Sequence, residues 1–182
     1  MLRIVSHPIG PLPALAPRTA SWRAELDDAL IAAPGDEDAR GRLRAPNALV
    51  ITTGQQPGLF TGPLYTVHKA LAAAALARVL ERRWNRPVIP VFWLAGDDHD
   101  YAEASAAHWL QSDGSLRKWS LPPRPADAPQ RSMSEEQLPA VVLDGLALLE
   151  ASLPAGSDRD RTMDWLRRHY APGATLQAAY AG

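Results

Sequence analysis

The 182-residue sequence contains no cysteine. This absence excludes disulfides, metal sites built on thiolates and a cysteine nucleophile. The sequence also lacks the run of roughly 18 or more apolar residues that a membrane-spanning helix needs. Its longest candidate, residues 70–79, is alanine-rich and contains Arg78. No apolar stretch typical of a signal peptide occurs near Met1, so we expect a cytoplasmic protein.

An excess of charge of either sign is also missing. The formal net charge is -1, from 19 basic and 20 acidic residues. No bulk electrostatic attraction to nucleic acid or to an anionic membrane is therefore expected. Apolar residues make up 46% and charged residues 21%, which is typical of a soluble globular domain with its own core.

A strand–helix–strand pattern occupies the middle of the chain. Residues 48–53 and 88–94 are short apolar runs that predict buried strands. Between them, a helix is predicted from Pro63, which suits a first helical position, to Asn85. The apolar residues of this helix recur at three- and four-residue spacing: Leu64, Val67, Leu71, Ala75 and Val79. The pattern predicts an α/β fold with a parallel sheet covered on both faces.

The flanking regions predict further elements. We divide the chain into an N-terminal lead-in and helix (residues 1–47, with the helix at 19–33) and a core (residues 48–182). Later elements of this core follow from local signals. They are a hairpin over residues 109–121 with Trp109 and Trp119 paired across it, a capping box at residues 134–137 before a helix to 153, a helix at 158–170, and one beginning at 175. Because the last helix begins so near the end, we expect a truncated core.

The first segment that carries chemistry is TGQQPGLFTGPLYTVHK, residues 53–69. Its glycines let the backbone turn sharply, and it leads into a helix N-terminus, which suits an anion such as phosphate or carboxylate. The alternative is a simple strand-to-helix turn with polar caps. The candidate substrate-binding residues here are Gln55, Gln56, Gly58, Thr61, Gly62, Tyr65, Thr66 and Lys69, with His68 as a candidate for proton transfer.

The second segment is WLAGDDHDYAE, residues 93–103, which follows a strand directly. Like charges this close repel one another, which makes sense if a cation or a ligand ammonium group lies beside them. The alternative is a helix cap, with Asp98 or Asp100 capping and Glu103 close behind. We assign no metal, because adjacent side chains cannot all face one ion from regular structure. The segment adds Asp97 as a binding candidate, and Asp98, His99 and Asp100 as catalytic candidates.

Taken together, residues 53–69 and the run PVFWLAGDDHD at residues 90–100 resemble the signature of the bacillithiol biosynthesis cysteine-adding enzymes. The resemblance implies a Rossmann-like core related to class I aminoacyl-tRNA synthetases. It also implies a carbon–nitrogen ligase whose small-molecule substrates are cysteine and glucosaminyl malate, joined by an amide bond. Family members are longer, with more of the core and a C-terminal coiled coil that dimerises. A homodimer is therefore expected only of the full-length protein.

The resemblance also suggests roles for the candidates. The helix N-terminus would hold an anionic group, Asp98 and Asp100 would hold an ammonium group, and His68 or His99 would transfer protons. Two alternatives remain open: a metal-dependent phosphoesterase, indicated by the acidic run at residues 97–100, and a truncated fragment that binds without catalysis.

The relation to the synthetases allows ATP or another nucleotide as a cofactor. However, their His-x-Gly-His motif corresponds here to Tyr65, Thr66, Val67 and His68, so a branched valine stands where glycine would let adenine approach the helix. The cofactor is therefore left unassigned.

We predict that a synthetase-type ATP site is altered or lost. Crystals of a full-length relative soaked with ATP should show no adenine against the residue equivalent to Val67. An adenine ring stacked over that position would contradict the prediction.

Overall fold

The computed structural model describes residues 30–31 and 38–182. The helix predicted for residues 19–33 therefore lies outside the described residues, apart from Leu30 and Ile31. The first described helix, α1 (Ala39–Leu43), was not predicted, since its five residues carry no clear periodicity. It is joined to the following unit by an ion pair of 2.6 Å between Arg42 and Glu81.

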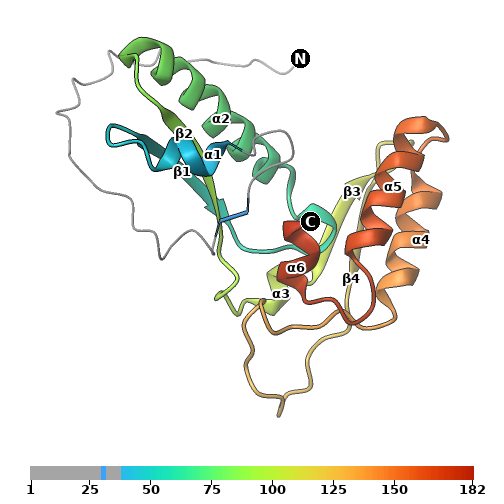
Figure 1. Cartoon of the computed structure of the whole chain (residues 1–182). Coiled ribbons are helices and arrows are strands. Elements are labelled where there is room, and N and C mark those ends of the chain that lie inside the picture. Colours follow the sequence, from blue (N-terminus) through green and yellow to red (C-terminus); the bar gives the residue numbers. More distant parts are fainter. Residues whose placement is uncertain (1–29, 32–37) are drawn as a thin grey trace.

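The predicted strand–helix–strand unit is confirmed (Figure 1). It consists of β1 (Leu49–Gln55), α2 (Leu64–Trp84) and β2 (Val88–Leu94). The two strands pair in parallel, with Leu49 opposite Val88 and Gln55 opposite Leu94. Asn85 ends α2 in the left-handed conformation, with φ of 48°. The crossover thus returns the chain to the start of the sheet, and both strands point in one direction.

The leucines and valines whose spacing predicted the helix α2 do not form its buried face. The buried residues of α2 are Thr66, Ala73, Ala77 and Leu80, whereas Leu71 is 62% exposed. Small alanines let the helix approach the two strands closely. Because α2 is apolar on more than one face, periodicity could not identify the one that packs. On the sheet, Trp93 is 65% exposed, so β2 is not covered on both faces among the described residues.

A second unit begins with the predicted hairpin, which spans residues 106–120 rather than 109–121. β3 (Ala106–Leu110) and β4 (Leu116–Ser120) pair antiparallel. The predicted pairing of the two hairpin tryptophans is wrong, because Trp109 lies opposite Arg117 and Trp119 opposite Ala107. The loop that joins Leu110 to Leu116 sets this register, and it offsets the two indoles along the hairpin. Both still pack against the main core.

Three helices complete this unit: α4 (Val142–Ser152), α5 (Ser157–His169) and α6 (Leu176–Ala181). The last two agree with prediction. The capping box at residues 134–137 is wrong, since α4 begins only at Val142. Gln137 instead bridges to Thr175, and the Leu138 N–H donates to the Ala174 carbonyl at 2.9 Å. This segment is therefore tied to the chain that leads into α6.

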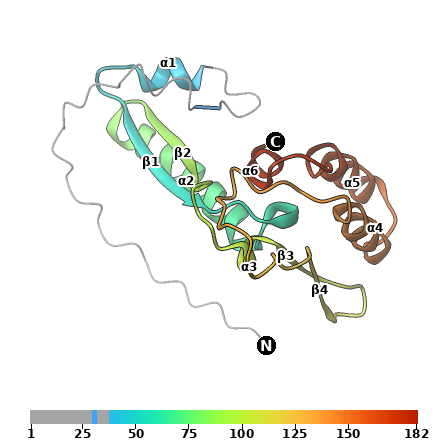
Figure 2. The same ribbon diagram turned by 90° about the horizontal axis from the view of Figure 1, so that it is seen from below.

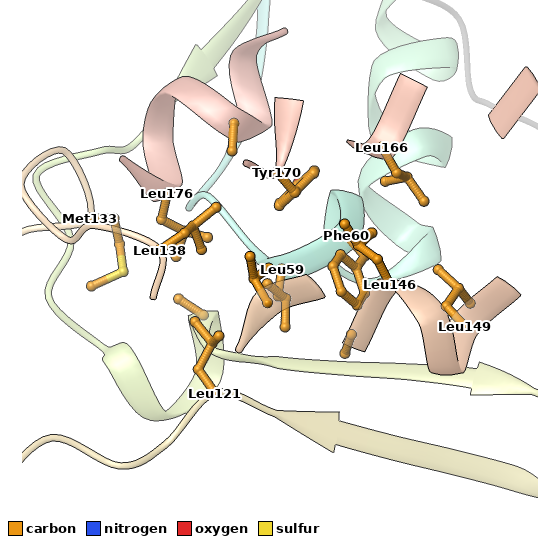
Figure 3. Close-up of a cluster of buried hydrophobic side chains, with 14 of the residues drawn as sticks. Leu59, Phe60, Leu121, Met133, Leu138, Leu146, Leu149, Leu166, Tyr170 and Leu176 are labelled. Atoms are coloured by element: carbon orange, nitrogen blue, oxygen red, sulfur yellow. The ribbon is translucent and has the colours of Figure 1, made fainter. Parts of the chain in front are cut away.

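The larger hydrophobic core lies in the second unit rather than around the parallel sheet. Figure 2 shows α4, α5 and α6 grouped on one side of the molecule, away from β1 and β2. Leu59 and Phe60, from the loop after β1, insert into this core (Figure 3). Among the described residues, the sheet has a smaller cluster, formed by Ala77, Leu80 and Val88. The two units are thus joined through the loop between β1 and α2.

No helix within the described ranges is long and apolar enough to cross a membrane.

Gly145 in α4 offers a test of how tightly this core is packed. A Cβ added at Gly145 would lie 2.6 Å from the Trp119 ring. We predict that Gly145→Ala lowers the free energy of unfolding by about 1–3 kcal/mol, the usual cost of overpacking. Urea unfolding would measure the loss. Ala147→Leu, on the exposed face of the same helix, should leave stability nearly unchanged; equal stabilities of the two variants would contradict this packing.

Candidate functional site

The two polar segments begin at the same edge of the parallel sheet. Gly54 lies opposite Trp93 at the carboxyl ends of β1 and β2. Just beyond the strands, the Ala95 N–H donates to the Gln55 carbonyl at 3.1 Å. This is the edge where parallel sheets bind ligands. The loops that start here, residues 55–63 and 95–100, form the candidate site.

The loop after β1 has an unusual backbone. It contains a short turn, η2 (Leu59–Thr61), in which Phe60 has φ of 50° and Thr61 has φ of 76°. Gly62 follows with φ of 68°, a region that side chains other than glycine rarely adopt. A Cβ at Gly58 would lie 2.8 Å from the Gly62 Cα, so the two ends of the turn are nearly in contact. The loop therefore has one tight conformation that glycine makes possible.

Lys69 connects this loop to α2. Its Nζ donates to the Gln55 Oε1 at 2.9 Å and to the Gly54 carbonyl at 3.2 Å. The same ammonium lies 5.0 Å from the centre of the Tyr65 ring. Tyr65, His68 and Lys69 are all exposed. Lys69 thus brings a positive charge to the end of β1, while it also fastens the first turns of α2 to the strand.

Buried polar groups gather near the N-terminus of α2. Thr66 is 7% exposed, and its Oγ1 has no hydrogen-bond partner among the described residues. The Gln56 Nε2 and the Tyr180 hydroxyl are also buried, and neither has a partner in the part of the chain that the structure describes. Burial raises the pKa of the Tyr180 hydroxyl above its ordinary value. The neighbouring Thr66 hydroxyl offsets part of this rise, although the two hydroxyls do not reach hydrogen-bond geometry. These donors add to a helix end whose dipole favours an anion.

The acidic loop after β2 is held by its own carboxylates. The Asp98 Oδ1 accepts from the Asp100 N–H at 2.8 Å. The Asp100 Oδ1 accepts from the Glu103 N–H at 3.1 Å and caps the short helix α3 (Tyr101–Ala104). The capping interpretation is therefore confirmed for Asp100. Asp97, His99 and Asp100 are exposed, and Asp98 is half-buried.

A cavity of about 710 Å³ opens beside this acidic loop. Its wall includes His99, Asp100 and Tyr101, together with Arg124 from the proline-rich segment after β4. The Tyr101 hydroxyl donates to the Pro122 carbonyl at 2.8 Å, and burial raises the pKa of Tyr101. The cavity therefore presents an imidazole, a carboxylate and a guanidinium against an aromatic surface.

Arg124 is fixed at this wall by several contacts. Its Nη2 donates to the Glu136 carboxylate at 2.8 Å and to the Arg131 carbonyl at 2.9 Å. Its guanidinium carbon lies 4.7 Å from the centre of the Tyr101 ring. The positive charge of Arg124 lowers the pKa of Tyr101, against the larger effects of burial and of the Glu136 charge. The wall is thus a connected cluster of aromatic and charged groups.

The predicted site residues fall into two groups. His99 and Asp100 line the cavity, whereas no residue of the described segment 53–69 does, so His68 and Lys69 lie apart from it. Among residues 30–31 and 38–182, no group of three or more histidine, aspartate or glutamate side chains is arranged to hold a metal ion. Sequence reasoning did not select Tyr101, although it directly follows Asp100 in the second segment. It also missed Arg124 and Tyr180, which approach the motifs only through tertiary folding.

Comparison with known proteins gives an independent view of these motifs. The family described as "Bacillithiol biosynthesis BshC, N-terminal Rossmann-like domain" matches residues 34–182. A protein of Salinibacter ruber called "Putative cysteine ligase BshC" is 37% identical over 139 residues, which are 76% of this chain and 25% of that protein. A protein of the same name from Shouchella clausii is 44% identical over 117 residues, 64% of this chain and 21% of its own length. The chain thus spans about a quarter of the length of such relatives.

Proposed function

Because the chain belongs to the bacillithiol biosynthesis BshC family and carries its N-terminal Rossmann-like domain, we propose that it supplies part of the active site of a cysteine ligase. The reaction joins the carboxyl carbon of cysteine to the amine of glucosaminyl malate. The observation that carries the proposal is that the two polar loops begin at adjacent strand ends, Gln55 opposite Leu94. Because the chain matches about a quarter of the length of its relatives, the proposal concerns the part that this region plays in the whole enzyme.

The anionic part of glucosaminyl malate binds at the N-terminus of α2. This assignment is supported by the helix dipole and by the buried, unpartnered donors of Gln56 and Thr66. The ammonium of Lys69, a residue of α2, lies at the end of β1 and adds a positive charge. The backbone between Gly58 and Gly62 gives this end of the site its shape. Carboxylates of the malyl group have the charge that these groups favour.

The amine partner binds at the acidic loop. Asp98 and Asp100 attract an ammonium group, and Asp97 adds a third negative charge. Amide formation requires this amine to lose a proton before its nitrogen attacks the carboxyl carbon, from which an oxygen leaving group must depart. His99, on the cavity wall, or His68, on α2, accepts the proton. The group that activates the carboxyl is not assigned.

The rest of the enzyme covers surfaces that this region leaves exposed. Leu71 on α2 is 62% exposed and Trp93 on β2 is 65% exposed, which supports further packing against the sheet unit. Dimerisation through a coiled coil and a cytoplasmic location belong to the same proposal for the full-length protein. Among the described residues, no group of three or more histidine, aspartate or glutamate side chains is arranged to hold a metal ion, so the structure adds no support to the phosphoesterase alternative.

Two substitutions in the full-length enzyme test these roles. Asp98→Asn keeps the oxygen that accepts from the Asp100 N–H but removes the negative charge. His68→Ala changes an exposed residue, so neither variant should unfold. We predict that turnover with cysteine and glucosaminyl malate falls roughly tenfold or more for Asp98→Asn and about 10²-fold for His68→Ala, as loss of a proton-transfer group usually causes.

Product formation can be followed by mass spectrometry of the thiol. His108→Ala, an exposed histidine on β3, is the control and should keep full activity. Unchanged turnover in both test variants would discard the assigned roles. Manganese-dependent hydrolysis of a simple phosphodiester would instead favour the phosphoesterase.

A further inference from the structure

We propose that Tyr170, at the end of α5, is a positioning residue for the loop that leads into α2. Its hydroxyl donates to the Gly58 carbonyl at 2.9 Å and accepts from the Thr61 N–H at 2.8 Å. The side chain is 0% exposed. One hydroxyl therefore connects the two ends of the turn, although it comes from a helix far along the sequence.

This loop needs such a connection because its backbone is unfavourable. Phe60 and Thr61 both have positive φ, and a β-branched residue such as Thr61 rarely adopts that region. Such a conformation persists only where surrounding structure determines it. The Tyr170 hydrogen bonds do this for the backbone. The Phe60 ring is held as well, since it stacks on Trp119 with centres 5.9 Å apart and meets Tyr170 edge-on at 5.6 Å.

The same part of the fold also holds the acidic loop. The Gly96 carbonyl accepts from the Ser134 N–H at 2.9 Å, and the Asp98 carbonyl accepts from the Met133 N–H at 2.8 Å. Met133 is in turn bonded to α6, because its carbonyl accepts from the Gln177 N–H at 3.1 Å. The Gln177 side chain fills the space beside Gly96, where an added Cβ would collide with it. The helical unit thus fixes both loops of the candidate site relative to each other.

Tyr170 is too deeply buried to touch a substrate that enters from solvent, so it acts through Thr61 and Gly58. Its hydroxyl sets where the backbone amides before α2 lie. Displacements of about 1 Å in such groups can lower a reaction rate by about 10²-fold. That Tyr170 holds the loop is independent of the proposed reaction. Its contribution to catalysis rests on the proposed function.

The test is Tyr170→Phe in the full-length protein, since phenylalanine keeps the ring packed against Phe60 and removes only the hydroxyl. We expect the Thr61 amide to exchange its hydrogen at least tenfold faster than in the wild type. The control is Leu149→Ala, which removes apolar volume from the same core without altering a hydrogen bond to the loop. Both variants are measured at the same interval below their melting temperatures. Equal hydrogen-exchange rates of the Thr61 amide in the two variants would overturn the proposal that Tyr170 holds the loop.

Kinetics with cysteine and glucosaminyl malate give the second readout. Well below the melting temperatures, kcat/KM should fall tenfold or more in Tyr170→Phe and less than twofold in Leu149→Ala. Faster Thr61 exchange with unchanged kcat/KM would overturn the catalytic part of the inference. If the wild type forms no amide product, the proposed function fails instead, and the exchange comparison still decides whether Tyr170 holds the loop.

Discussion

The parallel pairing of β1 with β2 is the interaction on which the candidate site depends. Because both strands run in the same direction, with Gly54 opposite Trp93, the chain leaves them at one edge. Two polar segments separated by the whole of α2 therefore start side by side. The chain therefore reaches the N-terminus of α2 and the loop with three aspartates from the same edge of the sheet. In the proposed reaction, the first would hold the malyl carboxylates of glucosaminyl malate and the second would hold its amine.

The sheet unit contributes little of the hydrophobic core, so its loops depend on the second unit. Leu59 and Phe60 leave the sheet and are buried among residues of the hairpin and of α4, α5 and α6. The acidic loop is fastened to the segment at residues 132–134. Stability and site geometry are thus linked. A substitution in the helical unit should therefore alter the geometry at the strand ends, because the loop after β1 is packed into the core of that unit.

Much of the local structure could be predicted from the sequence. Strand runs, the long helix, the hairpin turn and the position of both polar loops followed from periodicity and turn residues. The packing face of α2 could not be predicted, because the helix has alanines on one face and leucines and valines on another. Which face is buried depends on the shape of the neighbouring strands. The capping box at residues 134–137 failed for a similar reason: Gln137 pairs with Thr175, a partner that no local pattern indicates. Several residues at or behind the site come from distant segments and belong to no sequence motif, namely Arg124, Tyr170 and Tyr180.

The central claim is that the two loops of the candidate site, residues 55–63 and 95–100, form one binding site together with the N-terminus of α2. A crystal structure of the full-length enzyme with glucosaminyl malate bound would test it most directly. The account predicts that the carboxylates of the ligand lie at the N-terminus of α2 and that its amine lies beside Asp98 or Asp100. A ligand bound elsewhere, or one that touches only one of the two loops, would contradict it.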